Sequence, residues 1–347
     1  MFLFVFTALA CMLSSVASLT PVSTAKRAIC IVDSVASSIN LLSCTEVIIT
    51  PFTVPAGNTI NITAAPGASI LLAGSVTFAQ TTTPGPLFTF NTSNALFNGN
   101  GFIFEGNGPC TSGGTFKPHP LVEFQGSGTF TNFTIRDSPA QAISIATNPT
   151  SLFTAVTVSN GDGNALGSNG EPVGVNTDGF DVSASNVTIS GSIVVNQGDC
   201  IAITSGNNIT FVKKRNVSGV TFTGNLVFES MYGARINVNS NATNASVRNI
   251  TYTGNTITPG NVNQKYGLLI TQSYPEDFGT PGTNSVISNI TFNGTPTQQL
   301  ISTGQSPVVG VNCGNCAGNW SWTSLNATGG IDLVMSGGAR LIFNGLS

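Results

Sequence analysis

Charged side chains are scarce in this sequence of 347 residues. Asp, Glu, Lys and Arg together make up 7% of it, whereas they make up roughly 25% of a typical soluble protein. The net charge of −3 gives no electrostatic basis for binding nucleic acid or an anionic membrane. Disorder is also excluded, because 41% of the residues are hydrophobic. We therefore expect one large domain, or one elongated solenoid, with a substantial core.

Metal-binding residues are scarce as well. The only histidine is His119, and no second Cys or His pair accompanies the C-x2-C of Cys313 and Cys316. A zinc site needs such a second pair, so we predict no metal and no cofactor.

The N-terminus lacks a basic segment, but residues 1–18 otherwise are typical of a secretory signal peptide. An apolar run from Phe2 to Leu13 precedes small residues. This run is shorter than the roughly 17–25 residues that a membrane-spanning helix needs. We therefore predict a secreted, extracellular protein rather than a membrane-anchored one.

A Lys-Arg pair ends at residue 27, which marks residues 19–27 as a candidate propeptide and residues 28–347 as a single domain. Thirteen N-x-[ST] sequons agree with an extracellular glycoprotein. Once the leader is removed, six cysteines remain, and disulfides are their default state in an oxidising compartment.

Short β-branched or aromatic segments recur along the chain, among them SNVTISGSIVV, SGVTFTGNLVF and VRNITYTGNTIT. Their apolar positions alternate, and Asn and Gly punctuate them roughly every 20–30 residues, as in a β-solenoid or a propeller. A propeller blade needs about 40 residues, and a β-sandwich would not repeat one phrase. We predict an all-β parallel β-helix in which each coil buries side chains against the next. The only helix expected lies around residues 32–42.

Two acidic motifs stand out: NTDGFDV, residues 176–182, and NQGDCIAI, residues 196–203. Asp178 and Asp199 are about one coil apart, so their side chains are expected to project from adjacent coils about 4.8 Å apart. Inverting glycoside hydrolysis uses such a carboxyl pair, one group donating a proton and the other activating water. The alternative, that both acids cap backbone amides in turns, is equally compatible with the spacing. Asp181 is expected on the opposite side of the strand, in a structural hydrogen bond.

The two motifs and their surroundings resemble glycoside hydrolase family 28, the polygalacturonases, especially the fungal-type endo-polygalacturonases. Further segments follow in the family's order: CIVDSVASSINLLSCTEVIITPFTVPAGNTINI, GPLFTF, GNGPCTSGGTFKPHP, FTNFTIRDSP, VTVSNGDG, ARINV, KYGLLITQSY and CGNCAGNWSWTSL. The resemblance implies a right-handed parallel β-helix, here of about ten coils. It also implies hydrolysis of α-1,4 bonds between galacturonates in pectin, with inversion and without a metal. The implied partners of this monomer are pectin, oligogalacturonides and plant polygalacturonase-inhibiting proteins.

The resemblance also assigns roles to single residues. Asn176 and Asp178 match the family's N-T-D element, in which the Asp positions and activates water. Asp199 matches the second Asp of its N-Q-D-D-C element and shares that role. Arg235 matches the arginine that grips a substrate carboxylate, and Tyr266 matches the tyrosine of the neighbouring strand.

Two positions are degenerate relative to the family. Gly198 replaces the first Asp of N-Q-D-D-C, which is the family's general acid, and Asn237 replaces the lysine of its R-I-K element. The family's G-H-G strand between these elements is also missing, as though one strand and its turns were deleted. An error in the predicted gene near residue 212 would explain the missing strand but neither replacement.

Because general acid catalysis contributes roughly 10²–10⁴-fold, we expect a secreted, pectin-directed pseudoenzyme that binds oligogalacturonides. The alternative is an active endo-polygalacturonase. Glu229 is a weak candidate for a substitute proton donor. The basic run at residues 213–215 is a candidate carboxylate-binding segment, although a solvated turn is the simpler interpretation.

The resemblance also implies two disulfides, Cys30–Cys44 and Cys313–Cys316. Cys110 and Cys200 are then either paired with each other or free.

Overall fold

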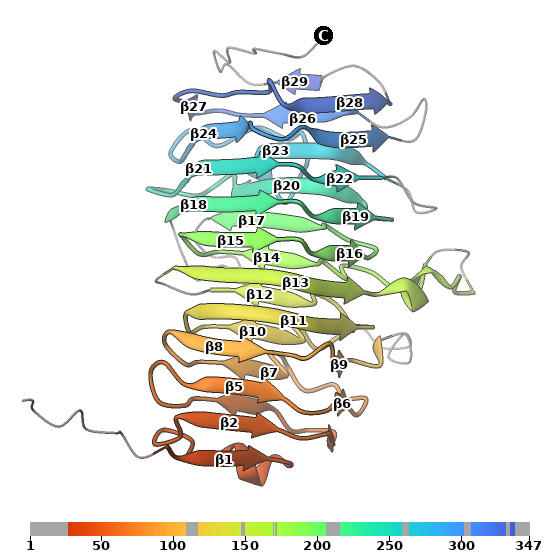
Figure 1. Cartoon of the computed structure of the whole chain (residues 1–347). Helices are drawn as coiled ribbons and strands as arrows, with labels where there is room; N and C mark the ends of the chain where they lie inside the picture. The colour runs from red at the N-terminus through yellow and green to blue at the C-terminus, as the bar shows by residue number, and fades with distance from the viewer. Residues whose placement is uncertain are drawn as a thin grey trace, which may run out of the picture.

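The structure of the protein is a computed structural model that describes residues 27–108, 117–146, 150–168, 170, 172–205, 216–258, 264–301, 307–330 and 334–336. The chain winds through these residues as a stack of coils, from β1 at one end to β29 at the other (Figure 1). The predicted signal peptide and nearly all of the candidate propeptide lie outside the described residues, and both stay predictions.

Parallel strands form two sheets that run the length of the stack. The larger sheet has 19 strands: β1 (Ile29–Val32), β2 (Glu46–Ile49), β3 (Phe52–Val54), β5 (Ser69–Leu72), β6 (Val76–Phe78), β8 (Ala95–Asn98), β9 (Ile103–Glu105), β11 (Gly128–Arg136), β13 (Ser151–Ser159), β15 (Val187–Ser190), β16 (Ile193–Val195), β18 (Asn216–Thr223), β19 (Leu226–Phe228), β21 (Ser246–Thr253), β22 (Thr256–Ile257), β24 (Val286–Phe292), β25 (Thr297–Ile301), β27 (Cys316–Ala317) and β28 (Leu325–Gly329). The smaller sheet has 10: β4 (Ile60–Ile62), β7 (Phe88–Phe90), β10 (Val122–Phe124), β12 (Ile143–Ile145), β14 (Phe180–Val182), β17 (Ile201–Ser205), β20 (Tyr232–Asn239), β23 (Tyr266–Tyr274), β26 (Val309–Asn312) and β29 (Val334–Ser336).

Each coil contributes one strand to the smaller sheet, and the 10 strands of that sheet agree with the predicted number of about ten coils. The larger sheet consists of two rows of strands. The long strands β11 and β13 run through both rows, since β11 pairs with both β8 and β9, and β13 pairs with both β15 and β16. The prediction of an all-β, right-handed parallel β-helix is therefore confirmed.

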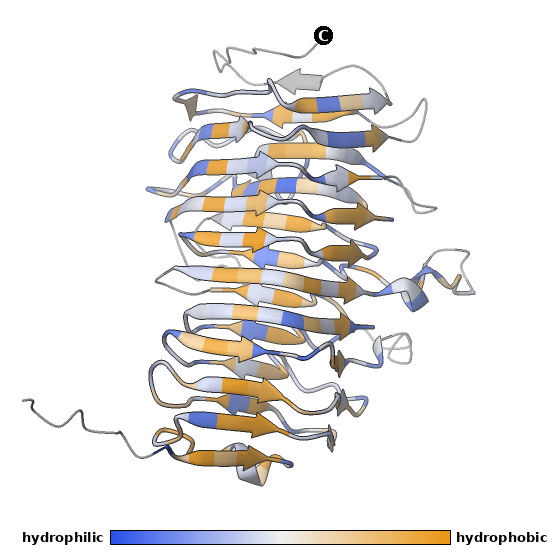
Figure 2. Cartoon of the chain, viewed as in Figure 1, coloured by the Kyte–Doolittle hydropathy of each residue, from blue (hydrophilic) through white to orange (hydrophobic). Residues whose placement is uncertain are grey.

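The core lies inside the coils, where apolar side chains of successive strands stack. Orange apolar positions recur along the strands at matching places of successive coils (Figure 2). Phe90 and Phe124 stack with ring centroids 5.0 Å apart, and Phe130 and Phe153 stack at 4.9 Å. Such aromatic pairs stabilise a core beyond their buried area. Because inward positions repeat in every coil, few places are left for charged residues, which explains their scarcity.

The repeated Asn-x-Thr phrase has a structural cause. Asn132, Asn249 and Asn289 all adopt positive φ angles, at 56°, 55° and 56°, a region that Asn tolerates better than most residues. The amide of Asn289 donates to Oδ1 of Asn249 at 2.9 Å across adjacent coils. Asn249 and Asn289 therefore stack at one bend of the coil.

Two short 3-10 turns lie in the described part of the chain, Ala36–Ser38 and Gly161–Asn164. The first lies inside the predicted helical region, and the second was not predicted. No helix in the described residues is long and apolar enough to cross a membrane.

Both expected disulfides are present. Cys30 pairs with Cys44, and Cys313 pairs with Cys316. Cys200 is buried and free, so of the two alternatives for it the structure favours the unpaired thiol. Cys110 lies outside the described residues.

Candidate functional site

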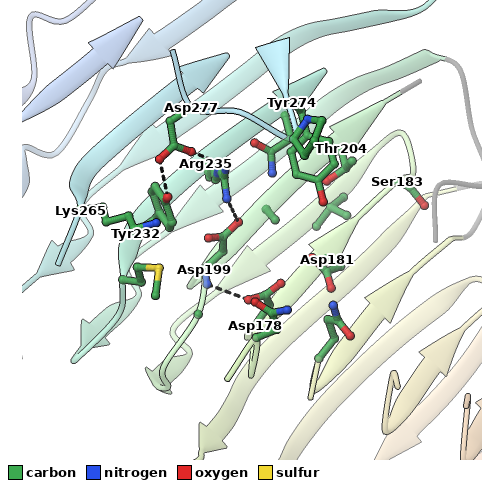
Figure 3. A pocket seen from close by; sticks show the side chains of 18 of the residues that line it. Asp178, Asp181, Ser183, Asp199, Thr204, Tyr232, Arg235, Lys265, Tyr274 and Asp277 are labelled. Carbon is green, nitrogen blue, oxygen red and sulfur yellow. Dashed lines mark hydrogen bonds and ion pairs between the residues drawn. The ribbon is translucent and has the colours of Figure 1, made fainter. Parts of the chain in front are cut away.

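A cleft of about 550 Å³ lies on the outer face of the smaller sheet. Its wall is formed by side chains of β12, β14, β17, β20 and β23, by segments that precede these strands, and by the segment that follows β23 (Figure 3). The residues that line it are Gln141, Ser144, Asn176, Asp178, Asp181, Val182, Ser183, Gly198, Asp199, Ala202, Thr204, Met231, Tyr232, Arg235, Asn237, Lys265, Tyr274, Pro275, Glu276 and Asp277.

Buried amide side chains fix the backbone of the NQGDC motif. The amide of Asn196 donates to the carbonyl oxygen of Asp199 at 2.7 Å and accepts from the Ser230 hydroxyl at 2.6 Å. The amide of Gln197 donates to the carbonyl oxygen of Asn160 at 2.7 Å. Because these groups are buried, losing any one bond would leave an unsatisfied partner. The motif is thus held rigidly, with Asp199 at the wall of the cleft.

Asp178 and Asp199 lie on adjacent coils, as their spacing predicts. The strands that follow them pair in register, with Phe180 opposite Ile201. The backbone N–H of Asp199 donates to Oδ1 of Asp178 at 2.9 Å. Asp178 therefore fits both interpretations of the motif. It accepts a hydrogen bond from a backbone amide, and it also lines the cleft. Burial, followed by the charge of Asp199, raises the pKa of Asp178 to about 8.

Asp181 lines the same cleft as Asp178, so its predicted place on the opposite side of the strand is wrong. Strand β14 begins only at Phe180, after a bend at Gly179. The two-residue alternation therefore does not extend back to Asp178. Within the described residues the Asp181 carboxyl has no hydrogen bond. Burial, then the charges of Asp178 and Asp199, raise its pKa well above its ordinary value.

Arg235 faces the cleft, as predicted, but two carboxylates already engage it. Its Nη2 lies 2.7 Å from Oδ1 of Asp277, and its Nη1 lies 3.5 Å from Oδ2 of Asp199. The guanidinium also lies 4.2 Å from the centroid of the Tyr232 ring, and the Tyr232 hydroxyl donates to Oδ2 of Asp277 at 2.7 Å. Sequence reasoning missed Tyr232 and Asp277. The only signal was their position beside two of the family's segments: Tyr232 comes two residues before ARINV, and Asp277 comes three residues after KYGLLITQSY.

Of Asp178, Asp181 and Asp199, Asp199 is the one that lies within ion-pair distance of Arg235. Burial raises its pKa, while Arg235 and a hydrogen bond from Asn237 act in the opposite direction. The other end of the Asn237 amide, Oδ1, is buried with no hydrogen-bond partner among the described residues, and so is Nε of Arg235. Buried polar groups without partners are rare in native structures. Neighbouring atoms cover both of these atoms, so neither is offered directly to a ligand.

Strand order explains why Arg235 reaches Asp199. Strand β17 pairs directly with β20, with Ala202 opposite Arg235. No strand lies between the coil that carries Asp199 and the coil that carries Arg235. This is the place where a G-H-G strand was expected to be missing.

Gly198 has no room for a side chain. A Cβ placed there would overlap Oδ1 of Asp178 and would lie 3.1 Å from the backbone nitrogens of Thr177 and Asp178. The Asp178 carboxyl thus occupies the space beside position 198.

The remaining candidates lie away from the cleft wall. Tyr266 is stacked between Tyr232 and Phe278, with centroids 5.9 and 5.8 Å away. It is not among the lining residues. Glu229 accepts a hydrogen bond from Asn164 and is also outside the lining. The basic run at residues 213–215 lies outside the described residues.

The described residues hold no group of three His, Cys, Asp or Glu side chains placed to bind a metal ion. The chemistry that this cleft offers is that of carboxyl groups. The pKa values of Asp178 and Asp181 are raised, and Asp199 and Asp277 are paired with Arg235. Together the fold and the cleft define a class of protein, a β-solenoid with the type of acidic site on which glycoside hydrolases depend.

Comparisons with known proteins specify the class further. The sequence model described as "Glycosyl hydrolases family 28" matches residues 44–336. Endopolygalacturonase 1 of Colletotrichum lindemuthianum is 33% identical over 92% of this chain and 93% of its own length. Endopolygalacturonase I of Aspergillus aculeatus is 30% identical over 83% of this chain and 80% of its own length.

Solved structures agree. Endopolygalacturonase I from Stereum purpureum, complexed with two galacturonate, matches with a TM-score of 0.75 and 41% identity over 91% of this chain and 99% of that one. An endo-xylogalacturonan hydrolase from Aspergillus tubingensis, at 18% identity over 88% of this chain and all of its own, shares the fold with a TM-score of 0.51. The chain belongs to glycosyl hydrolases family 28, as its motifs predict.

Proposed function

We propose that this chain is a secreted, pectin-directed member of its family that binds galacturonan in the cleft and hydrolyses it at most in trace amounts. The observation that carries the proposal is Gly198. The family's general acid is expected at that position, and the Asp178 carboxyl fills the space beside it.

Three features support binding. Relatives at 30–33% identity are endopolygalacturonases, and a related structure contains galacturonate. The cleft lies on the outer face of a sheet whose strands come from successive coils. Asn176, at the rim, is exposed and lines the same cleft.

Loss of catalysis is supported by the arrangement around Asp199. This residue keeps the position of the water-activating carboxylate, but no carboxyl at position 198 faces it to protonate the leaving oxygen. Asn237 supplies no positive charge, and β17 and β20 pair without an intervening strand. Losing general acid catalysis alone costs roughly 10²–10⁴-fold in rate.

An active endo-polygalacturonase is the second candidate, and one observation favours it. The raised pKa values of Asp178 and Asp181 mean that the cleft still holds carboxyl protons near neutral pH. One of these groups would have to act as the general acid in place of position 198.

Secretion as a glycoprotein is part of the proposal. The two disulfides fit an oxidising compartment. A secreted protein that binds pectin fragments without cleaving them would also suit a role as a monomeric decoy for plant polygalacturonase-inhibiting proteins.

The test is a pair of measurements on the intact secreted protein. Reducing-sugar release from polygalacturonate and from pectin is compared with that of the Stereum purpureum enzyme and with an Asp199→Asn variant. Calorimetry measures binding of oligogalacturonides. We expect measurable binding, with release at least about 10²-fold below the reference enzyme. Release near that of the reference, and abolished in Asp199→Asn, would establish the active alternative. Absence of binding would reject the proposal.

A further inference from the structure

The cleft is richer in acid than the binding of a polyanion requires. Among the residues that the structure describes, five carboxyl groups and two cations line it: Asp178, Asp181, Asp199, Glu276 and Asp277, with Arg235 and Lys265. The raised pKa of Asp178, caused by burial and by Asp199, is a further sign that added negative charge is disfavoured there. An unesterified galacturonan carries one carboxylate on each sugar, so its binding would bring more charge of the same sign into the cleft.

Arg235 cannot offset this charge freely. Its two terminal nitrogens face Asp277 at 2.7 Å and Asp199 at 3.5 Å, while the Tyr232 ring covers one face of the guanidinium. A ligand carboxylate would have to displace Asp277, which also accepts the Tyr232 hydroxyl at 2.7 Å. The other cation, Lys265, is exposed, where salt screens its attraction.

Asn237 adds a neutral side chain to the wall of the cleft, where the family pattern has a lysine. It therefore supplies no positive charge to pair with a ligand carboxylate. An ester carbonyl or a sugar hydroxyl, in contrast, would bring no charge into the cleft.

We propose that the cleft binds galacturonan whose carboxyl groups are methyl-esterified, and that Asp277 sets this preference by neutralising Arg235. This inference rests on the proposed function, since it specifies the chemical form of the galacturonan that the same cleft binds. Asp277 acts as a specificity-determining residue through Arg235. Without the negative charge of Asp277, the guanidinium of Arg235 can bind a ligand carboxylate.

The experiment compares two oligogalacturonides of equal length, one unesterified and one fully methyl-esterified, by calorimetry on the intact protein. The wild type is expected to bind the ester at least about 10-fold more tightly. Asp277→Asn keeps the shape of the side chain and one acceptor oxygen. It should raise affinity for the unesterified oligomer about 10-fold and leave affinity for the ester within about 3-fold. The gain should shrink between about 0.05 M and about 0.5 M salt, because it is electrostatic.

Glu276→Gln is the matched control, since it removes an equal charge from the same cleft without contacting Arg235. It should change the ratio of the two affinities less than about 3-fold. Tighter binding of the unesterified oligomer by the wild type would overturn the preference and leave the proposed function standing. An unchanged ratio in a folded Asp277→Asn protein would overturn the role of Asp277. Failure of both oligomers to bind the wild type would overturn the proposed function as well.

Discussion

Replacing Gly198 by Asp restores the family's motif in sequence, yet the structure predicts that the variant is both inactive and less stable. A Cβ at this position overlaps Oδ1 of Asp178 and lies 3.1 Å from two backbone nitrogens. The Asp178 carboxyl must therefore rotate away. When it does, it gives up the N–H of Asp199, which it now accepts at 2.9 Å.

The expected loss of stability follows from that one hydrogen bond. The N–H of Asp199 would be left without a partner, and an unsatisfied donor of this kind costs about 1–3 kcal/mol. We therefore expect the free energy of unfolding to fall by about 1–3 kcal/mol. The new carboxyl adds repulsion with Asp178 and Asp199, so its own pKa should be raised.

Chemical denaturation and a reducing-sugar assay test both halves of this prediction. Gly198→Ala has the same overlap without the charge and should account for most of the loss of stability. In the double variant Gly198→Ala, Asp178→Gly the two losses should be clearly less than additive, because removing the Asp178 carboxyl also removes the overlap. Hydrolysis should stay at the wild-type level in Gly198→Asp, since no strand separates β17 from β20. Full stability of Gly198→Ala, or polygalacturonate hydrolysis by Gly198→Asp, would refute the reasoning.

Two further predictions concern stability. The native pKa of Asp178 lies near 8 rather than 3.8, so the folded state retains a proton that the unfolded state has released. The free energy of unfolding should therefore fall as pH rises from about 4 to about 8, by at most about 1.4 kcal/mol per pH unit for this group. Melting curves of Asp178→Asn should show a smaller fall across that window. Inside the coils, Asn225 accepts from the N–H of Ser192 at 2.8 Å and donates to the carbonyl oxygen of Ile189 at 3.1 Å. Asn225→Ala leaves both buried groups unpaired and should cost about 2–4 kcal/mol in denaturant titrations, whereas the exposed Asn326→Ala should change stability by less than about 0.5 kcal/mol.

Each of these two stability predictions can be contradicted by one result. If the pH dependence of wild type and Asp178→Asn is the same, the proton is not held by Asp178. If Asn225→Ala is as stable as Asn326→Ala, the internal amide ladder does not contribute to the stability of the coils.

Much of the architecture follows from local sequence. Strand β21 (Ser246–Thr253) and strand β24 (Val286–Phe292) each contain the same Asn-Ile-Thr phrase, and each places its Asn at positive φ. The residues of each of these coils therefore specify both its strand and the bend at its Asn. For this reason the alternation of apolar residues, and the order of the family's motifs, predicted the solenoid, its approximate number of coils, and the adjacency of Asp178 and Asp199.

The candidate site was only partly predictable. Asp181 was assigned to the wrong side because a period of two was extended through the bend at Gly179. The assignment therefore failed because the backbone path at Gly179 interrupts the strand. The role of Tyr266 came from the family's motif and stays a prediction; the structure adds that its ring stacks between Tyr232 and Phe278.

The sequence by itself determined the fold, the family and the loss of an acid at position 198, because each depends on residue types at fixed local spacings. Only the tertiary structure decided the electrostatic state of the cleft. Asp277 reaches Arg235 across 42 residues of sequence, and Arg235 reaches Asp199 because their coils are direct neighbours. The charge that a ligand meets depends on which coils are stacked and on how their turns fold back. No spacing within one motif contains that information.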